Sequence, residues 1–170
     1  MGITNSSQST DVKKLLTLLS DFKSVFFVTL SNSGQLGMRP MTVIEFQDAP
    51  YIWFVTDRSS QKIQDSIDSN SVYITAQSGS EIFVTAHGVP KVFEDEQTKD
   101  RLWSEPLRVW FPKGKEDPEL CFVRVELTKG EYWDSSGLQK LYYFTEAIKS
   151  YVTGKTPEIN KDQHAEVQIS

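Results

Sequence analysis

The sequence is poor in the residues on which disulfides, metal centres and membrane spans depend. Among its 170 residues are one cysteine, Cys121, and two histidines, His87 and His164. An internal disulfide is therefore impossible, and no spacing of these residues suits a zinc site. No apolar run approaches the roughly 20 residues of a membrane helix, and the polar start MGITNSSQST lacks the apolar core of a signal peptide. These absences predict a protein of the reducing cytoplasm with no membrane partner.

Charge and motif content argue against further classes of protein. The net charge is −5 at pH 7, and Lys and Arg are scattered instead of forming the basic stripe that a nucleic-acid backbone requires. There is no G-x-G-x-x-G after a strand, no G-x-x-x-x-G-K-[ST] loop and no nucleophile-elbow pattern. Dinucleotide folds, triphosphate loops and serine hydrolases therefore have no support, and no nucleic-acid partner is expected.

Aromatic residues are plentiful, at 12% of the chain, and many lie in short β-branched runs. Asn32-Ser33-Gly34 interrupts two such runs, as in a hairpin. The runs predict strands over residues 24–30, 36–46, 51–56, 71–77, 81–93, 119–127 and 130–134. Long βαβ spacing is missing, so a doubly wound parallel sheet is disfavoured. The predicted fold is mainly β (α+β), an antiparallel barrel with peripheral helices.

Apolar periodicity predicts several helices around this barrel. They cover about residues 10–22, with Thr10 or Asp11 as cap, and residues 61–69, 94–103 and 138–152. We expect residues 1–9 to be disordered and residues 10–153 to form one domain. Residues 154–170 are a polar tail, expected to be mobile or to lie against a neighbouring subunit.

One segment has the composition of an anion site. FVTDRSSQK runs from a strand through a hydroxyl-rich turn into a helix start, where free amides and the helix dipole favour a phosphate. Its hydroxyls are those of Thr56, Ser59 and Ser60, and Lys62 at the helix start adds a positive charge. Arg39 on the preceding strand could reach the same phosphate with its forked guanidinium. The competing interpretation is that Ser59 or Ser60 only caps the helix and that Lys62 is solvated.

Taken together, five motifs resemble the pyridoxamine 5′-phosphate oxidase-like flavoproteins, and within them the general-stress-protein branch. The motifs are GQLGMRPM, YIWFVTDRSSQK, HGVPKVFED, RLWSEPLRVWFPKGKEDPEL and EYWD. The resemblance extends from about Val12 to Asp134, in the same order and at compatible spacings. It implies a split β-barrel that forms a homodimer and binds FMN in a groove shared by both subunits.

The resemblance also implies a set of cofactor-binding residues. Arg39 and Lys62 match the basic ligands of the FMN phosphate, and Ser60 and Gln61 lie in the same loop. The strand beneath the flavin is matched by Met41 and Thr42, and the backbone and hydroxyl contacts of the next strand by Val55 and Thr56. Two tryptophans complete the set: Trp133 of EYW matches an aromatic near the flavin, and Trp110 covers the ring from the other subunit or serves as a core or lid residue.

One departure from the family separates the candidate functions. Pyridoxamine-phosphate oxidases carry an Arg- and His-rich substrate segment after the EFW-like motif, but here SSGLQKLYYFTEAIKSY contains neither residue. The leading hypothesis is therefore an FMN-binding protein with a redox or flavin-holding role in stress, and no catalytic residue is assigned. The alternatives are oxidation of pyridoxamine or pyridoxine phosphate, and a split-barrel module for haem or a deazaflavin with His87 facing a groove.

Overall fold

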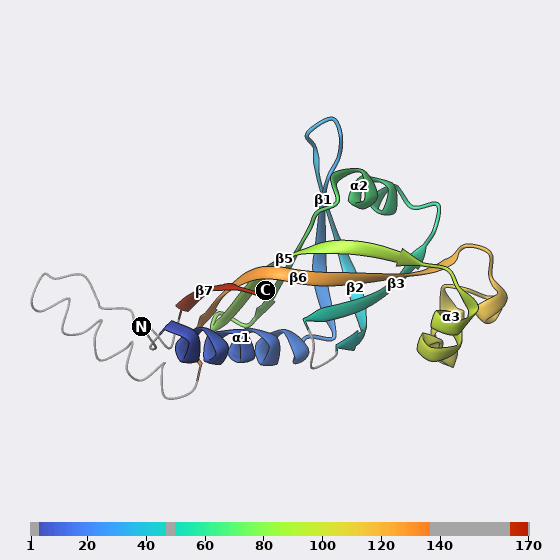
Figure 1. Ribbon diagram of the computed structural model, residues 1–170. Helices are drawn as coiled ribbons and strands as arrows, with labels where there is room; N and C mark the ends of the chain where they lie inside the picture. Colours follow the sequence, from blue (N-terminus) through green and yellow to red (C-terminus); the bar gives the residue numbers. More distant parts are fainter. Residues whose placement is uncertain (1–3, 47–49, 137–163, 170) are drawn as a thin grey trace, which may run out of the picture.

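The computed structural model describes residues 4–46, 50–136 and 164–169, and the strands among them form one antiparallel sheet (Figure 1). Its strand order is β3-β2-β1-β4-β5-β6-β7. The bounds of these strands are β1 Ser24–Leu30, β2 Leu36–Phe46, β3 Tyr51–Asp57, β4 Val72–Ser78, β5 Ile82–Phe93, β6 Leu120–Asp134 and β7 His164–Gln168.

The sheet closes on itself because the first half of β6 pairs with β3, from Thr56 opposite Cys121 to Tyr51 opposite Glu126. The second half of β6 pairs with β7 instead, from Lys129 to Trp133. The six strands β1 to β6 thus form a closed barrel, and β7 extends the sheet beyond it. The prediction of an antiparallel barrel with peripheral helices is confirmed.

Alternating residues of the strands fill the barrel with apolar side chains, among them Phe27, Phe54, Ile74, Val84 and Val123. Helix α1 (Thr4–Ser20) runs beside β7 and covers one side of this core (Figure 1). It inserts Leu15 and Leu19, which are almost fully buried. Burial of this kind contributes about 1.5–3 kcal/mol for a large apolar side chain.

A second, smaller apolar cluster lies outside the barrel. It joins Trp53 and Phe122 of the sheet to Leu102, Leu107 and Phe111. The last three belong to a segment after β5 that contains α3 (Glu96–Leu102), η1 (Glu105–Val109) and η2 (Gly114–Glu116). This cluster fixes the whole segment against the far end of the barrel from β7 (Figure 1).

Three features differ from the sequence-based expectation. Helix α1 begins at Thr4, inside the segment expected to be disordered, and contacts β7. Residues 164–168 of the polar tail form strand β7 on β6 of the same chain. β6 is one continuous strand across Thr128-Lys129-Gly130, where two strands were expected. In each case pairing or packing with a distant segment outweighs weak local signals.

The helix expected over residues 138–152 lies outside the described residues. Within the described part of the chain, no helix has the length and apolar character needed to span a membrane. Helix α2 (Gln61–Ser69) has the predicted bounds and packs mainly on β1.

Candidate functional site

The site lies where β2 and β3 separate. The two strands pair at Val43 opposite Phe54, but the residues of β2 before Val43 pair only with β1. A cavity of about 370 Å³ opens between the diverging strands. It is lined by Pro40, Met41, Thr42, Val55, Thr56, Asp57, Trp110 and Phe111. Five of the ten residues expected to bind the cofactor thus surround one cavity: Met41, Thr42, Val55, Thr56 and Trp110.

The aromatic wall of the cavity comes from the segment between α3 and β6. Trp110 and Phe111 both donate a backbone hydrogen bond to the carbonyl of Leu107, at 3.0 Å each. Phe111 is buried in the second apolar cluster, whereas the Trp110 side chain is 63% exposed at the cavity. An exposed flat ring on an anchored loop is suited to contact a flat ligand. Within its own chain, Trp110 lines this cavity.

Several buried polar atoms have no hydrogen-bond partner, and one of them belongs to Thr56 of the cavity wall. Among the described residues these include Arg39 Nη1, Thr56 Oγ1 and Ser60 Oγ, three positions expected to contact the phosphate or its loop. Arg39 lies two residues before Met41, on the inward face of β2. A buried polar group without a partner costs about 1–3 kcal/mol, so such groups are rare unless a ligand or water completes them.

The hydroxyl groups of the turn before α2 have different roles. Ser59 donates both its backbone N–H and its hydroxyl to Asp57 Oδ1, at 2.7 and 2.6 Å. Ser60 is the N-cap residue of α2, yet its side chain makes no capping hydrogen bond. The interpretation of these serines as simple helix caps therefore does not describe the Ser60 side chain, which stays available to a ligand.

The next two residues begin α2. Gln61 is exposed and donates from Nε2 to Asp65 Oδ1 at 2.9 Å, within the helix. Lys62 occupies the second position of α2, and its side chain lies outside the description. Both residues thus stand in the first turn of α2, where free amides and the helix dipole favour an anion.

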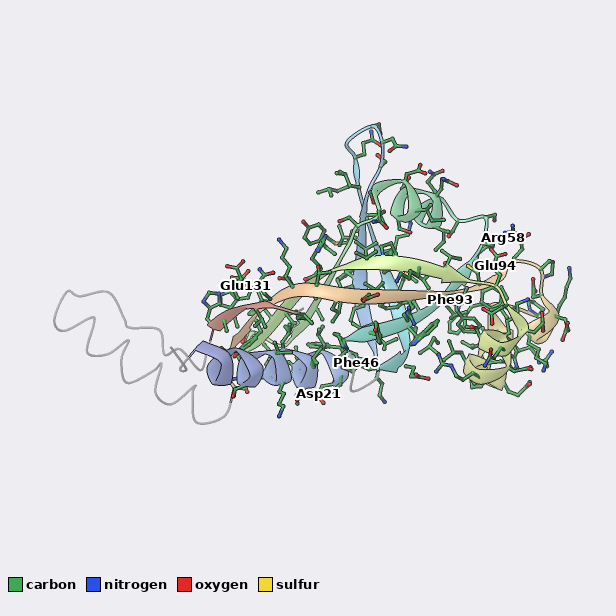
Figure 2. All side chains as sticks on the ribbon, viewed as in Figure 1. Asp21, Phe46, Arg58, Phe93, Glu94 and Glu131 are labelled. Atoms are coloured by element: carbon green, nitrogen blue, oxygen red, sulfur yellow. The ribbon has the colours of Figure 1, made fainter. Side chains whose placement is uncertain are left out.

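Trp133 is not part of this cavity. β6 runs from Cys121, opposite Thr56, to Trp133, a path of roughly 40 Å at about 3.3 Å per residue. Figure 2 shows the two ends: Arg58 and Glu94, an ion pair at 3.1 Å, lie near α3, and Glu131 lies near β7. Trp133 stacks on His164 of β7, with ring centroids 4.9 Å apart. Any contact between Trp133 and the cavity therefore requires a second copy of the chain.

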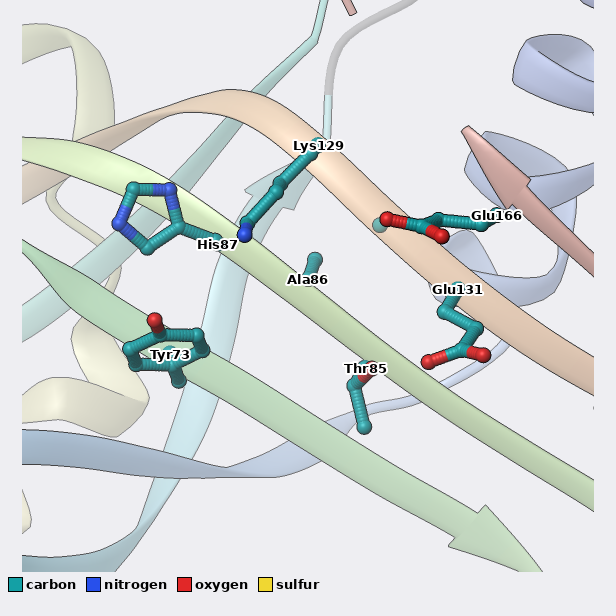
Figure 3. A pocket seen from close by; sticks show the side chains of 8 residues that line it. Tyr73, Thr85, Ala86, His87, Lys129, Glu131 and Glu166 are labelled. Atoms are coloured by element: carbon teal, nitrogen blue, oxygen red, sulfur yellow. The ribbon is translucent and has the colours of Figure 1, made fainter. Parts of the chain in front are cut away.

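His87 lies in a separate cavity of about 140 Å³ on the outer face of the sheet, between Tyr73 and Lys129 (Figure 3). Its Nε2 hydrogen-bonds Ser71 Oγ and its Nδ1 hydrogen-bonds Thr128 Oγ1, both at 2.8 Å. Burial, with a smaller contribution from the Lys129 charge, lowers the pKa of His87. Both ring nitrogens are engaged, so His87 offers no free ligand to a haem iron, and the cavity is small for one.

Sequence reasoning missed Pro40, Asp57 and Phe111 as cavity-lining residues. Each is the immediate sequence neighbour of a residue that was expected at the site. This adjacency is the one feature of the sequence that could have indicated them. Phe111 is the second aromatic of the motif WFPKG, but its burial against Leu107 could not be read from the sequence.

Comparison with known proteins identifies the family of this chain. The sequence profile of the pyridoxamine 5′-phosphate oxidase-like family matches residues 10–158. This chain belongs to that family. The resemblance drawn from the five motifs is thereby confirmed.

Individual members of the family extend the comparison. General stress protein 26 of Bacillus subtilis (strain 168) is 26% identical over 120 residues, which cover 68% of this chain and 84% of the relative. The structure of the general stress FMN/FAD binding protein from Xanthomonas citri is 26% identical, with a TM-score of 0.62, and the match covers 74% of this chain and 89% of that one.

A third relative shows the shared fold. It is a Clostridium acetobutylicum protein related to general stress protein 26, of the pyridoxinephosphate oxidase family, which is 18% identical with a TM-score of 0.64. The match covers 72% of this chain and 89% of the relative. The chain is thus similar to general stress proteins in both sequence and fold.

Proposed function

We propose that this family member binds FMN in the cavity between β2 and β3 and serves as a general-stress flavoprotein of the cytoplasm. The observation that carries the proposal is that Thr56, whose Oγ1 is buried without a partner, lines an aromatic-walled cavity, while Arg39 Nη1 and Ser60 Oγ are likewise buried without partners on the two segments that supply the cavity walls. A phosphate monoester carries oxygens for all three donors, and its charge pairs with Arg39.

The cavity supports a flat ring system beside this phosphate. Its walls combine apolar side chains, Met41 and Val55, with the rings of Trp110 and Phe111, and small-ligand sites commonly have this character. Its volume of about 370 Å³ lies in the lower part of the range for such sites. The relative from Xanthomonas citri, described as FMN/FAD binding, supports a flavin as the ligand.

When bound, the flavin would supply hydride or electron transfer, and the protein would supply position and electrostatics. In the proposed complex, Arg39, Thr56, Ser60 and the first turn of α2 hold the phosphate. Met41, Thr42 and Val55 lie along the ring, and Trp110 covers it. No described side chain of the cavity is assigned as a proton donor.

We further propose a homodimer formed through the outer face of the sheet. Exposed apolar side chains lie on this face: Phe26 opposite Pro40, Met38 and Tyr73 on either side of the buried Val28, and Phe83 opposite Trp133. Several exposed apolar side chains gathered on one face commonly mark an interface. A second copy is also what would bring Trp133 to a cavity, as the family resemblance implies.

The flavin proposal is tested by titrating the purified protein with FMN, FAD and riboflavin and following flavin fluorescence. We expect FMN to bind most tightly. In Arg39→Ala/Lys62→Ala, FMN affinity should fall by a hundredfold or more, because each charge-assisted hydrogen bond contributes about 1.5–3 kcal/mol. Riboflavin, which lacks the phosphate, should bind the double variant about as well as it binds the wild type.

The matched control is Lys13→Ala/Lys91→Ala, which removes two exposed charges from residues that do not line the cavity and should bind FMN normally. Equal losses of FMN and riboflavin affinity would show that the phosphate assignment is wrong. A wild-type protein that binds no flavin would refute the proposed function itself.

The dimer is tested by the mass of the protein in solution. This mass should be twice the 19.4 kDa of one chain, and Phe83→Glu should reduce it to that of one chain.

A further inference from the structure

Thr29 carries a third buried hydroxyl without a partner, after those of Thr56 and Ser60, and no sequence motif pointed to it. It lies on β1, is 1% exposed, and its Oγ1 has no hydrogen-bond partner among the described residues. In the β1–β2 register Thr29 stands directly opposite Gly37, and Phe27 stands opposite Arg39. Thr29, Gly37 and Arg39 therefore share the inward face of the sheet, because residues two apart on a strand point to the same side.

Gly37 explains how the guanidinium reaches Thr29. A Cβ atom built on Gly37 would lie 3.0 Å from Arg39 Nη1 and 3.2 Å from Thr29 Oγ1. The guanidinium therefore folds back along its own strand into the space left by the missing side chain. The backbone of Gly37 does not have the positive φ that would itself demand glycine. Space for Arg39 is the remaining reason for glycine at this position.

The two polar atoms on either side of Gly37 are both buried and both unsatisfied. Both atoms lie about 3 Å from the position that a Cβ atom of residue 37 would occupy. They nevertheless form no hydrogen bond with each other. A hydroxyl can donate to an anion and a guanidinium N–H can do the same, so one anionic group completes both. Without it, each unsatisfied group costs stability.

We propose that Thr29 and Gly37 form the inner wall of the anion site: Gly37 provides the room in which the Arg39 guanidinium lies, and Thr29 donates its hydroxyl to the phosphate that the guanidinium also holds. Thr29 is thus a further binding residue and Gly37 determines specificity for a phosphorylated flavin. This inference rests on the proposed function, because the anion is the phosphate monoester of FMN.

Two substitutions of Thr29 separate the role of its hydroxyl from the role of its volume. Thr29→Val retains the side-chain volume and removes the hydroxyl, whereas Thr29→Ser retains the hydroxyl. We expect Thr29→Val to weaken FMN binding about tenfold, the effect of one hydrogen bond to a charged group, and to leave riboflavin binding unchanged. Thr29→Ser should bind FMN within about twofold of the wild type. Thr85→Val, on the outer face, is the matched control and should bind both flavins normally.

A double-mutant cycle tests whether Thr29 acts through Arg39. In an Arg39→Met background, Thr29→Val should have a smaller effect on FMN affinity than in the wild type, because residues that hold the same group are not additive. Gly37→Ala should likewise weaken FMN and spare riboflavin, since its Cβ requires the guanidinium to move by a few tenths of an ångström. Thermal unfolding of each flavin-free variant verifies that the fold is intact.

The outcomes separate the two proposals. If the wild type binds FMN and Thr29→Val binds it equally well, this inference is overturned and the proposed function stands. Equal losses of FMN and riboflavin in Thr29→Val would also overturn it, because the hydroxyl would then support the fold instead of the phosphate. If the wild type binds no flavin, both proposals fall.

Discussion

The two ends of β6 differ in how the polar groups around them are satisfied. At the cavity end, Arg39, Thr56 and Ser60 each present a buried polar atom without a partner. At the β7 end, His164 Nε2 bonds Glu131 at 2.7 Å and Lys14 bonds Asp134 at 3.0 Å. Polar groups that serve the fold are paired within the fold, whereas those left unpaired at a cavity are available to a ligand.

Asp134 illustrates the satisfied end. Burial by itself raises the pKa of this carboxyl, but hydrogen bonds from Ser136 and the Lys14 ammonium outweigh it, and the pKa of Asp134 is lowered. Ser136 and Lys14 of the same chain therefore stabilise the charged form of Asp134. Stability from this group is present at neutral pH and is lost only as the pH falls below the ordinary carboxyl range.

An unpaired atom alone does not identify a ligand site. Trp53 Nε1 and Arg124 Nε are also buried without hydrogen-bond partners, but they lie outside the cavity. The Arg124 guanidinium instead lies 4.7 Å from the Tyr51 ring centroid and 5.1 Å from that of Phe93. Ring faces attract this cation without hydrogen bonds. What distinguishes the other end is Thr56, whose unpaired hydroxyl belongs to a residue of the cavity wall.

Glycine also has a different role at each end of β6: Gly37 leaves room for the Arg39 guanidinium, whereas Gly130 leaves room for the apolar side chain of Leu15. Gly130→Ala should therefore have the largest effect on stability. A Cβ on Gly130 would lie 2.5 Å from Leu15 Cδ2 and 3.0 Å from the Thr85 carbonyl oxygen. Since Leu15 is a fully buried residue of α1, we expect a loss of about 1–3 kcal/mol in the free energy of unfolding, measured in urea. FMN affinity of the folded variant should not change. Lys129→Ala, at the exposed neighbouring position, is the control and should unfold like the wild type.

A pair of Thr→Val substitutions compares the two kinds of hydroxyl directly. Thr128 Oγ1 accepts from or donates to His87 Nδ1 and lies 3.3 Å from the His87 carbonyl oxygen, so Thr128→Val should lose about 1 kcal/mol of stability and retain FMN affinity. Thr56→Val removes an unpaired hydroxyl, so the flavin-free protein should be as stable as the wild type or slightly more stable, with FMN binding about tenfold weaker. Urea unfolding and flavin titration measure both. If Thr56→Val destabilises as much as Thr128→Val, the distinction between the ends is wrong.

The smallest expected effect is the pH response of His87. Its pKa is lowered in the folded chain by burial and by Lys129, so the unfolded chain takes up the proton first as the pH falls. The free energy of unfolding should therefore decline from about pH 7.5 through the ordinary histidine pKa near 6.5, and level off below the folded value. His87→Gln should reduce this slope in urea unfolding measured across the range. An unchanged slope would show that His87 does not titrate with folding.

Much of the architecture followed from local patterns. The β-branched runs located β1 to β5 within one or two residues, because strand and turn preferences agree there with the final sheet. The FVTDRSSQK segment was placed correctly as the end of β3 and the start of α2. β7 was missed because five polar-rich residues have little preference for a strand until β6 offers its edge.

The site was predictable to the extent that it is local. Arg39, Thr56 and Ser60 were identified from charge, hydroxyl content and a helix start. Thr29 was not, because it lies in the apolar run SVFFVTL and its relation to Arg39 exists only through the register of β1 on β2. Trp133 was grouped with the cavity from the family resemblance, but the length of β6 separates them within one chain.

The sequence by itself determined the alternation of strands and turns, the family and the chemical character of the anion segment, since these depend on residues close together in the chain. Only the tertiary structure decided where β2 leaves β3, which hydroxyls find partners and which glycine makes room for Arg39. Those outcomes depend on strand register and on volume, and both are set by contacts between residues far apart in the chain.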